Sequence, residues 1–363
     1  MLTKQRFPEL SKKLGDCGVS FITDIRAEGR GAAIANTYFL DMGDQYYMID
    51  AACSKKRLRR IRDHLQGRNC DLLATHSHLD HSANSGAAVN QRSRIIFHPL
   101  VEHKIDNLQR NYTEITPAMI NAFGVEGFFG RTGMLRPSMR KKLLFIQKHF
   151  PSFFSQLMKL VSLALLRINI GHIHSPHANV QYLSYADQRD LIFDGIHFSG
   201  WDLGNGIFAL ETPGHQNDHL AFYIPGRRIM FAGDLINFLN PNDILDGSIK
   251  DTHAGLNKML QLAEAGAIDI LALSHALPIV GSDQAVSYIR TIIAQQDEIF
   301  ATVAGIVNSC SDKNDFAEII AKIYRHESEL MKRVLKINYP RSVSFIDVYV
   351  YLYLQEFLHP DID

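Results

Sequence analysis

The stretch Thr75-His76-Ser77-His78-Leu79-Asp80-His81-Ser82 places three imidazoles and one carboxylate within six residues. It follows the apolar run 72–74, which predicts a short buried strand, so the cluster falls at the carboxyl end of a strand, where α/β proteins place their chemistry. Imidazole nitrogens and carboxylate oxygens are donors that zinc accepts. Neighbouring side chains of an extended stretch point to opposite sides, so one pair can bind one ion and the next pair a second. We therefore interpret the stretch as a metal site rather than a chance histidine-rich loop.

The His-x-His-x-Asp-His pattern of this stretch resembles the signature of the metallo-β-lactamase superfamily. Four other segments resemble the remaining motifs of that superfamily, and they occur in the expected order. They are the opening hairpin at 36–40 and 46–50, the second histidine motif Glu211-Thr212-Pro213-Gly214-His215, the strand 228–234 that ends in Asp234, and the strand 268–275 that ends in His275. One such match could be accidental, but an ordered set is a strong signal for this family.

Seven side chains are candidate metal ligands by this resemblance. His76, His78 and His215 would bind the first ion, Asp80, His81 and His275 the second, and Asp234 would bridge the two. Two divalent ions would make the burial of the carboxylates tolerable. The resemblance implies zinc as the metal, with iron or manganese as alternatives. Because His78 stands where the oxygen-reducing diiron members typically carry glutamate, the pattern favours hydrolysis over redox chemistry.

Two positions depart from the family pattern. Ser274 and Ala276 flank the last histidine where glycines are common, and the usual Asp-x-Gly of the hairpin is Asp50-Ala51-Ala52. Both changes add only small side chains and leave the ligand candidates in place. Asp218 and His219 resemble an acidic-histidine pair of some thioesterase-like relatives. We expect them either to fix ligand tautomers or to cap a turn before the strand 220–224.

The composition of the chain limits the classes of protein to which it can belong. Formal net charge is zero and the pI is about 7.3, so an overall basic surface for nucleic acid is absent. The four cysteines show no paired spacing, which fits a reducing compartment. The start of the chain is charged and lacks the apolar stretch of a signal peptide. These features predict a cytoplasmic protein.

The resemblance implies an αβ/βα four-layer sandwich, with two mixed sheets packed face to face and helices outside. At 363 residues the chain is longer than one typical domain, so additions to this core are expected. We expect the first half of the sandwich over residues 1–100, a helical insertion over 101–180, the second half over 181–283, and a helical carboxyl-terminal region over 284–363.

The insertion is both basic and apolar from about residue 139 to 170. Lys159 and Arg167 interrupt its second apolar run before it reaches the roughly 18 uncharged residues that a membrane span needs. We favour a cap that forms an apolar pocket over the metals, ahead of a subdomain that packs or dimerises, and of a surface that touches lipid. His172, His174 and His177 form a small cluster in which we expect no additional metal site.

These observations predict a dinuclear metal-dependent hydrolase whose metal-bound hydroxide attacks an ester, thioester or lactone with an apolar tail. Asp80 is the candidate catalytic residue, since it could orient that hydroxide as well as bind metal. Phosphodiester or RNA hydrolysis is the alternative, which the neutral charge weakens. A metal-binding sensor that acts through a partner is a third hypothesis. The expected partner is a small-molecule substrate, and a homodimer is compatible with the sequence.

Overall fold

The computed structural model describes residues 7–25, 34–102, 136–169, 179–237, 247–313, 315–334, 338–339 and 343–358. The chain divides into two compact units. Unit 1 consists of residues 1–106 and 172–294, and unit 2 consists of residues 107–171 and 295–363. The cluster His172, His174 and His177 lies outside the described residues. The boundaries of the four predicted segments stay a prediction.

The first sheet of unit 1 has six strands in the order β1-β2-β3-β4-β5-β6. Their bounds are Val19–Ile22, Thr37–Asp41, Tyr46–Ile49, Asp71–Leu73, Ile95–Phe97 and Val180–Tyr182. The first three strands pair antiparallel, and β3, β4, β5 and β6 pair parallel. The predicted opening hairpin is therefore present as β2 and β3.

The second sheet of unit 1 has seven strands in the order β13-β12-β11-β10-β9-β8-β7. From β7 to β13 their bounds are Arg189–Phe193, Ile196–Asp202, Phe208–Glu211, Leu220–Ile224, Ile229–Phe231, Ile270–Ala272 and Ile279–Val280. Only β11 and β12 pair parallel in this sheet, so both sheets are mixed, as expected from the sequence.

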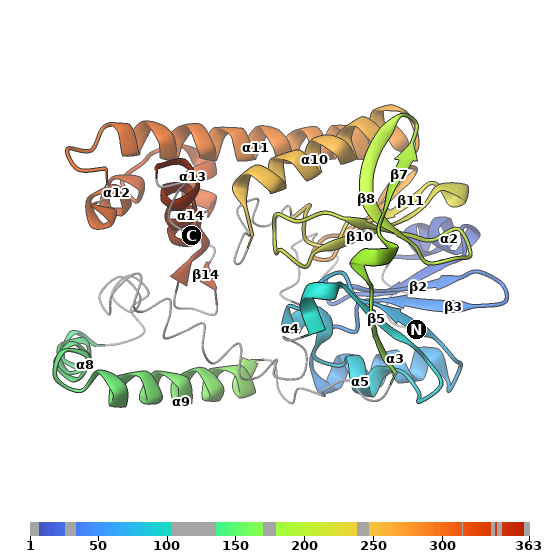
Figure 1. The fold of residues 1–363 in the computed structure, drawn as a ribbon, viewed down its shortest axis with the longest axis horizontal. Helices are drawn as coiled ribbons and strands as arrows, with labels where there is room; N and C mark the ends of the chain where they lie inside the picture. The colour runs from blue at the N-terminus through green and yellow to red at the C-terminus, as the bar shows by residue number, and fades with distance from the viewer. Residues whose placement is uncertain are drawn as a thin grey trace. The chain divides into compact units, whose positions relative to one another are not determined.

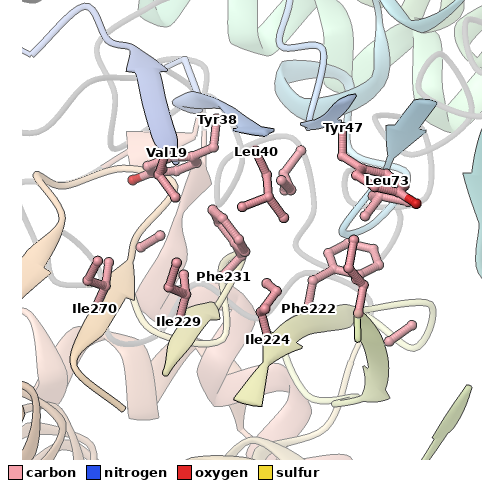
Figure 2. Packing of buried hydrophobic residues seen from close by; sticks show 14 of the residues in the cluster. Val19, Tyr38, Leu40, Tyr47, Leu73, Phe222, Ile224, Ile229, Phe231 and Ile270 are labelled. Carbon is pink, nitrogen blue, oxygen red and sulfur yellow. The ribbon is translucent and has the colours of Figure 1, made fainter. Parts of the chain in front are cut away.

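The two sheets pack face to face through a buried apolar layer (Figure 2). Strands β1 to β4 contribute Val19, Tyr38, Leu40, Tyr47 and Leu73, and strands β10 to β12 contribute Phe222, Ile224, Ile229, Phe231 and Ile270. Alternate residues of each strand face this layer because strand side chains alternate between the two faces. Full burial of each such side chain contributes about 1.5–3 kcal/mol of transfer free energy.

Helices cover the outer faces of both sheets (Figure 1). Helix α3, Lys55–Leu65, begins at the cap Ser54 and buries one apolar stripe, and its His64 stacks on Phe39 of β2 with ring centroids 4.0 Å apart. Helix α10, Ile249–Glu264, and the first part of α11, Ser282–Asn308, pack apolar side chains on the second sheet. This arrangement is the predicted four-layer sandwich.

The remaining elements of unit 1 are short. Helix α2, Pro8–Asp16, precedes β1 and buries Leu14 at the layer between the sheets. Helices α4, Leu79–Ser82, and α5, Ser85–Ala88, follow β4. The single turns η1, Pro99–Val101, η2, Tyr185–Asp187, and η3, Pro225–Arg227, lie in connections between strands.

Unit 2 is helical where the structure describes it, apart from a small hairpin. Helices α8, Pro137–His149, and α9, Pro151–Asn169, are separated at Pro151, a proline that favours the start of a helix. The end of α11 is followed by α12, Phe316–Ile323, α13, Glu329–Val334, and α14, Phe345–Leu358. Strands β14, Asn338–Tyr339, and β15, Val343–Ser344, form the hairpin. None of the described helices is long and apolar enough to cross a membrane.

We predict that Phe222→Ala lowers the free energy of unfolding by about 3–5 kcal/mol, since it removes an aromatic ring from a fully buried position and leaves a cavity. Urea unfolding in the presence of a chelator measures the change without a contribution from metal binding. The control is Ile192→Ala on the surface of β7, where the side chain is 57% exposed and the change should stay within about 0.5 kcal/mol. Equal losses in the two variants would contradict the assigned core.

Candidate metal centre

The first group of donors comes from the loop after β4 and the turn after β9. His76 and His78 follow β4 directly, and His215 lies four residues beyond the last residue of β9. Nδ1 of His78 lies 2.9 Å from Nε2 of His76 and 2.9 Å from Nε2 of His215. All three side chains are buried. Three ring nitrogens gathered in this way can share one ion that takes a further ligand.

The second group of donors combines residues of helix α4 with a residue that follows β12. The short helix α4 presents Asp80 and His81, and His275 follows β12. Oδ2 of Asp80 lies 3.5 Å from Nε2 of His81 and 3.2 Å from Nε2 of His275. The three ligand atoms lie within 4.8 Å of one another, close enough for a single ion to bind all of them.

Asp234, which follows β11, lies between the two groups. Its Oδ2 is 3.6 Å from Nε2 of His215, 3.3 Å from Nε2 of His81 and 3.1 Å from Nε2 of His275. One carboxylate therefore faces one nitrogen of the first group and two of the second, as a bridging ligand would. The structure thus brings all seven predicted ligand candidates together, and their role as ligands stays a prediction.

The donors fit a pair of divalent ions. Among the described residues, two buried donor-group atoms, Nε2 of His81 and Oδ1 of Asp234, have no hydrogen-bond partner. A buried polar atom without a partner costs about 1–3 kcal/mol, so a coordinated ion would relieve both atoms. Mixed nitrogen and oxygen donors suit zinc, iron or manganese.

The pKa values of the imidazoles differ across the centre and indicate where positive charge is favoured. Burial, together with the neighbouring imidazoles, holds the pKa of His76 and of His78 well below the usual value, so these rings are neutral and can donate a lone pair. Burial works in the same direction at His81 and His275, but the surrounding carboxylates, Asp234 foremost, together outweigh it and raise the pKa of both rings well above the usual value. These shifts show that the carboxylates favour positive charge at the two rings beside Asp234.

Asp50 orients His81, a role that the sequence analysis did not assign. Oδ2 of Asp50 accepts a hydrogen bond from Nδ1 of His81 at 2.7 Å, which leaves Nε2 of His81 for the centre. Oδ1 of Asp50 accepts from the backbone N–H of Thr75 at 2.8 Å. Asp50 has φ +59°, a left-handed conformation that turns the chain at the end of β3. The sequence did contain a signal for this role. Asp50 directly follows β3, and the histidine cluster follows the neighbouring parallel strand β4.

Asp218 and His219 support the backbone of the centre, so they do more than cap a local turn. Oδ2 of Asp218 accepts from the backbone N–H of Ser77 at 2.9 Å. Nδ1 of His219 donates to the carbonyl of Thr212 at 3.0 Å, and its Nε2 accepts from the backbone N–H of Asp234 at 3.0 Å. Burial is the main cause that lowers the pKa of His219 to about 3, so this ring is neutral, as its acceptor role requires.

The segment before β2 holds the loop that carries His275. Nδ2 of Asn36 donates to the carbonyl of Leu273 at 2.9 Å and to the carbonyl of Ala276 at 2.7 Å. The backbone N–H of Asn36 donates to the carbonyl of Ser274 at 2.7 Å. One buried side chain therefore fixes the backbone on both sides of His275. Spacing along the sequence gave no sign of this contact, because it joins opposite ends of unit 1.

The centre opens towards Asp80. The side chain of Asp80 is 27% exposed and that of His275 is 10% exposed. The side chains of His81, His215 and Asp234 are at most 3% exposed. A substrate that comes from solvent would therefore meet Asp80 before the deeper donors. Although burial opposes it, the adjacent His81 and His275 lower the pKa of Asp80 to about 2, so this carboxylate is ionised at neutral pH.

Comparison with known proteins supports the fold. No family model matches the chain. A metallo-beta-lactamase family protein from Thermus thermophilus is similar in structure with a TM-score of 0.50 and 15% sequence identity, over 93% of this chain and 93% of that chain. The stereoselective inverting sec-alkylsulfatase Pisa1 from Pseudomonas sp. is similar with a TM-score of 0.52 and 14% identity. That match covers 89% of this chain and 47% of the sulfatase, so this chain spans about half the length of the enzyme.

The fold of this chain is therefore the metallo-β-lactamase fold, as the motifs predicted. At these levels of identity the likeness extends to the fold alone. The function has to be argued from the centre itself.

We predict that Asn36→Ala weakens the second metal site by about 10–100-fold, because the loop that presents His275 loses two side-chain hydrogen bonds. The isosteric Asn36→Asp, which lacks the Nδ2 donor, should have a similar effect. Calorimetric titration of the chelator-stripped protein with zinc measures the two sites separately. The control Asn205→Ala removes a bond to the hydroxyl of Tyr47 and should leave both sites unchanged. Equal affinities in wild type and both Asn36 variants would contradict this role.

Proposed function

We propose that this protein is a dinuclear metal-dependent hydrolase. The observation that carries the proposal is the convergence of seven donors in two groups that share the carboxylate of Asp234. When bound, two divalent ions would lower the pKa of a coordinated water from about 16 towards about 7 and polarise the bond to be cleaved. No serine or cysteine nucleophile is needed for such chemistry.

The residues of the chain have distinct roles in this proposal. His76 and His78 are neutral and, with His215, would bind one ion, and Asp234 would bridge this ion and the second. Asp80 is ionised and faces solvent, so its carboxylate can accept a hydrogen bond from the attacking water and orient it. His81 is held by Asp50 with Nε2 directed to the centre.

The proposed substrate is an ester, thioester or lactone with an apolar tail. Its support comes from the apolar composition of the insertion, which matches the alkyl or aryl part of such a substrate. A sulfate ester of a secondary alcohol is a second candidate, because the sec-alkylsulfatase has the same fold over most of this chain. Both candidates combine a polar ester with an alkyl group, and they differ in the leaving group.

We predict that the purified protein holds close to two transition-metal ions per chain, and that Asp234→Ala loses at least one of them. The reason is that the remaining donors are arranged around the shared carboxylate and cannot replace it. Elemental analysis after gel filtration measures the content. The control is Asp190→Ala on the surface of β7, which lies outside the centre and should keep both ions. A wild-type protein that takes up no metal on titration would refute the dinuclear centre.

We predict that His78→Ala abolishes hydrolysis of acyl substrates, with a loss of at least about 100-fold in kcat/KM, because one ion loses a ligand. The measurement is a panel of acyl thioesters, lactones, aryl esters, secondary alkyl sulfates, bis-aryl phosphodiesters and single-stranded RNA. The control His197→Ala removes an exposed histidine on β8 and should keep wild-type rates.

The same panel separates the alternatives. Turnover of alkyl sulfates alone would move the assignment to a sulfatase. Salt-sensitive cleavage of RNA with negligible acyl turnover would replace the acyl proposal by a ribonuclease-like activity. Full metal content without turnover of any substrate would favour a metal-binding sensor.

A further inference from the structure

The sequence contains one long segment without any acidic residue. Between Glu126 and Asp187 there are eight lysines and arginines and no aspartate or glutamate. The whole chain has 38 acidic residues in 363, which corresponds to about six in a segment of this length. A chain that is neutral overall therefore carries a strongly cationic region, whose described helices are α8 and α9 of unit 2.

Apolar side chains are exposed on the same two helices. Six of the nine exposed large hydrophobic residues in the described part of the chain belong to residues 136–169, and α8 contains no buried residue. They are Met139, Leu144, Phe145, Phe150, Phe153 and Leu160, with exposed fractions from 38% to 65%. Such a concentration is unusual for a surface in contact with water alone and marks an interaction site.

The cations and the exposed apolar groups alternate along the helices. Lys141 and Lys142 lie one helical turn before Phe145, and Lys148 lies one turn after it. All four side chains are exposed. The aliphatic stems of lysine can lie along an apolar phase while the ammonium groups reach its polar boundary. This pattern is typical of helices that lie in the interface of a membrane.

We infer that the surface of α8 and α9 binds peripherally to an anionic lipid membrane. Phe145, Phe150, Phe153 and Leu160 would enter the boundary between headgroups and acyl chains, and the lysines and arginines would contact the anionic headgroups. The helices do not span the bilayer, in agreement with the absence of a membrane-spanning helix among the described residues.

Other occupants satisfy fewer of these observations. A nucleic acid would pair with the cations, and a single strand could stack bases on the phenylalanines, but the aliphatic side chains of Met139, Leu144 and Leu160 would stay in water. A second copy of the same surface would cover the apolar groups but would bring two sets of cations together without a single carboxylate to balance them. An anionic bilayer provides both an apolar phase and negative charge.

The test is co-sedimentation of the full chain with two kinds of vesicles, phosphatidylcholine alone and phosphatidylcholine with about 30 mol% phosphatidylglycerol. We expect binding to the anionic vesicles, at least about tenfold weaker binding to the neutral vesicles, and release as salt is raised. The double variant Phe145→Ser/Phe153→Ser and the triple variant Lys141→Gln/Lys142→Gln/Lys148→Gln should each weaken binding by about tenfold or more.

Matched control variants distinguish binding through this surface from non-specific binding to vesicles. Ile192→Ser changes an equally exposed apolar residue on β7, and Lys12→Gln/Lys13→Gln changes two exposed lysines of α2. Both should bind vesicles like wild type. All substituted positions lie at the surface, so the thermal unfolding midpoints of the variants should equal that of the wild type. If the midpoint of the phenylalanine variant or of the lysine variant shifts, the test rests on the other of these two variants.

Several outcomes would overturn the inference. These are no sedimentation with anionic vesicles, equal binding to neutral vesicles, equal losses in the control variants, or RNA binding that is lost in the triple variant while the vesicles bind no protein. The metal centre does not enter this experiment, so its result is independent of the proposed hydrolase activity.

Discussion

Negative charge gathered at the junction of the two sheets is the constraint around which unit 1 is organised. Asp50, Asp80 and Asp234 approach one another through shared imidazoles, and two of the three carboxylates are almost fully buried. Carboxylates in such a place require cations or many hydrogen-bond donors, because burial without them costs several kcal/mol per charge. The raised pKa values of His81 and His275 reflect the same preference for positive charge, which two divalent ions would satisfy.

The centre exists only because both halves of the sandwich are present. The backbone N–H of Leu220 donates to the carbonyl of Thr75, and Asp218 holds the backbone of Ser77, so the second sheet supports the histidine loop of the first. In return, Asn36 of the first half supports the loop that carries His275 in the second. The apolar layer between the sheets therefore sets the distance across which these contacts and the shared ligands can form.

The resemblance of the sequence motifs predicted the sandwich and the opening hairpin, and it named seven candidate donors that the structure brings together. The signal was that each candidate lies in a segment that follows an apolar, strand-forming run. The sequence did not reveal the contacts of Asp50 and Asn36, because both depend on which strands become neighbours and on partners up to 240 residues away. Helix α2 was not predicted either, although Pro8 at its start and Glu9 in its first turn are local signals for a helix. The pair Asp218 and His219 was recognised from the sequence, but its backbone partners could only come from the structure.

Net charge averages over the chain and does not describe local regions of the surface. A neutral total hides a cationic segment around α8 and α9 and a carboxylate-rich centre in unit 1. The local charge at the centre is negative and favours bound metal ions. The local charge on the helices is positive and favours an anionic partner. Cations alone would be compatible with a polyanionic partner. On α8 and α9 they alternate with exposed aromatic rings, and this combination fits the boundary of a lipid phase. Esters with apolar tails partition into such a boundary, so membrane binding would bring the protein to the substrates proposed for it.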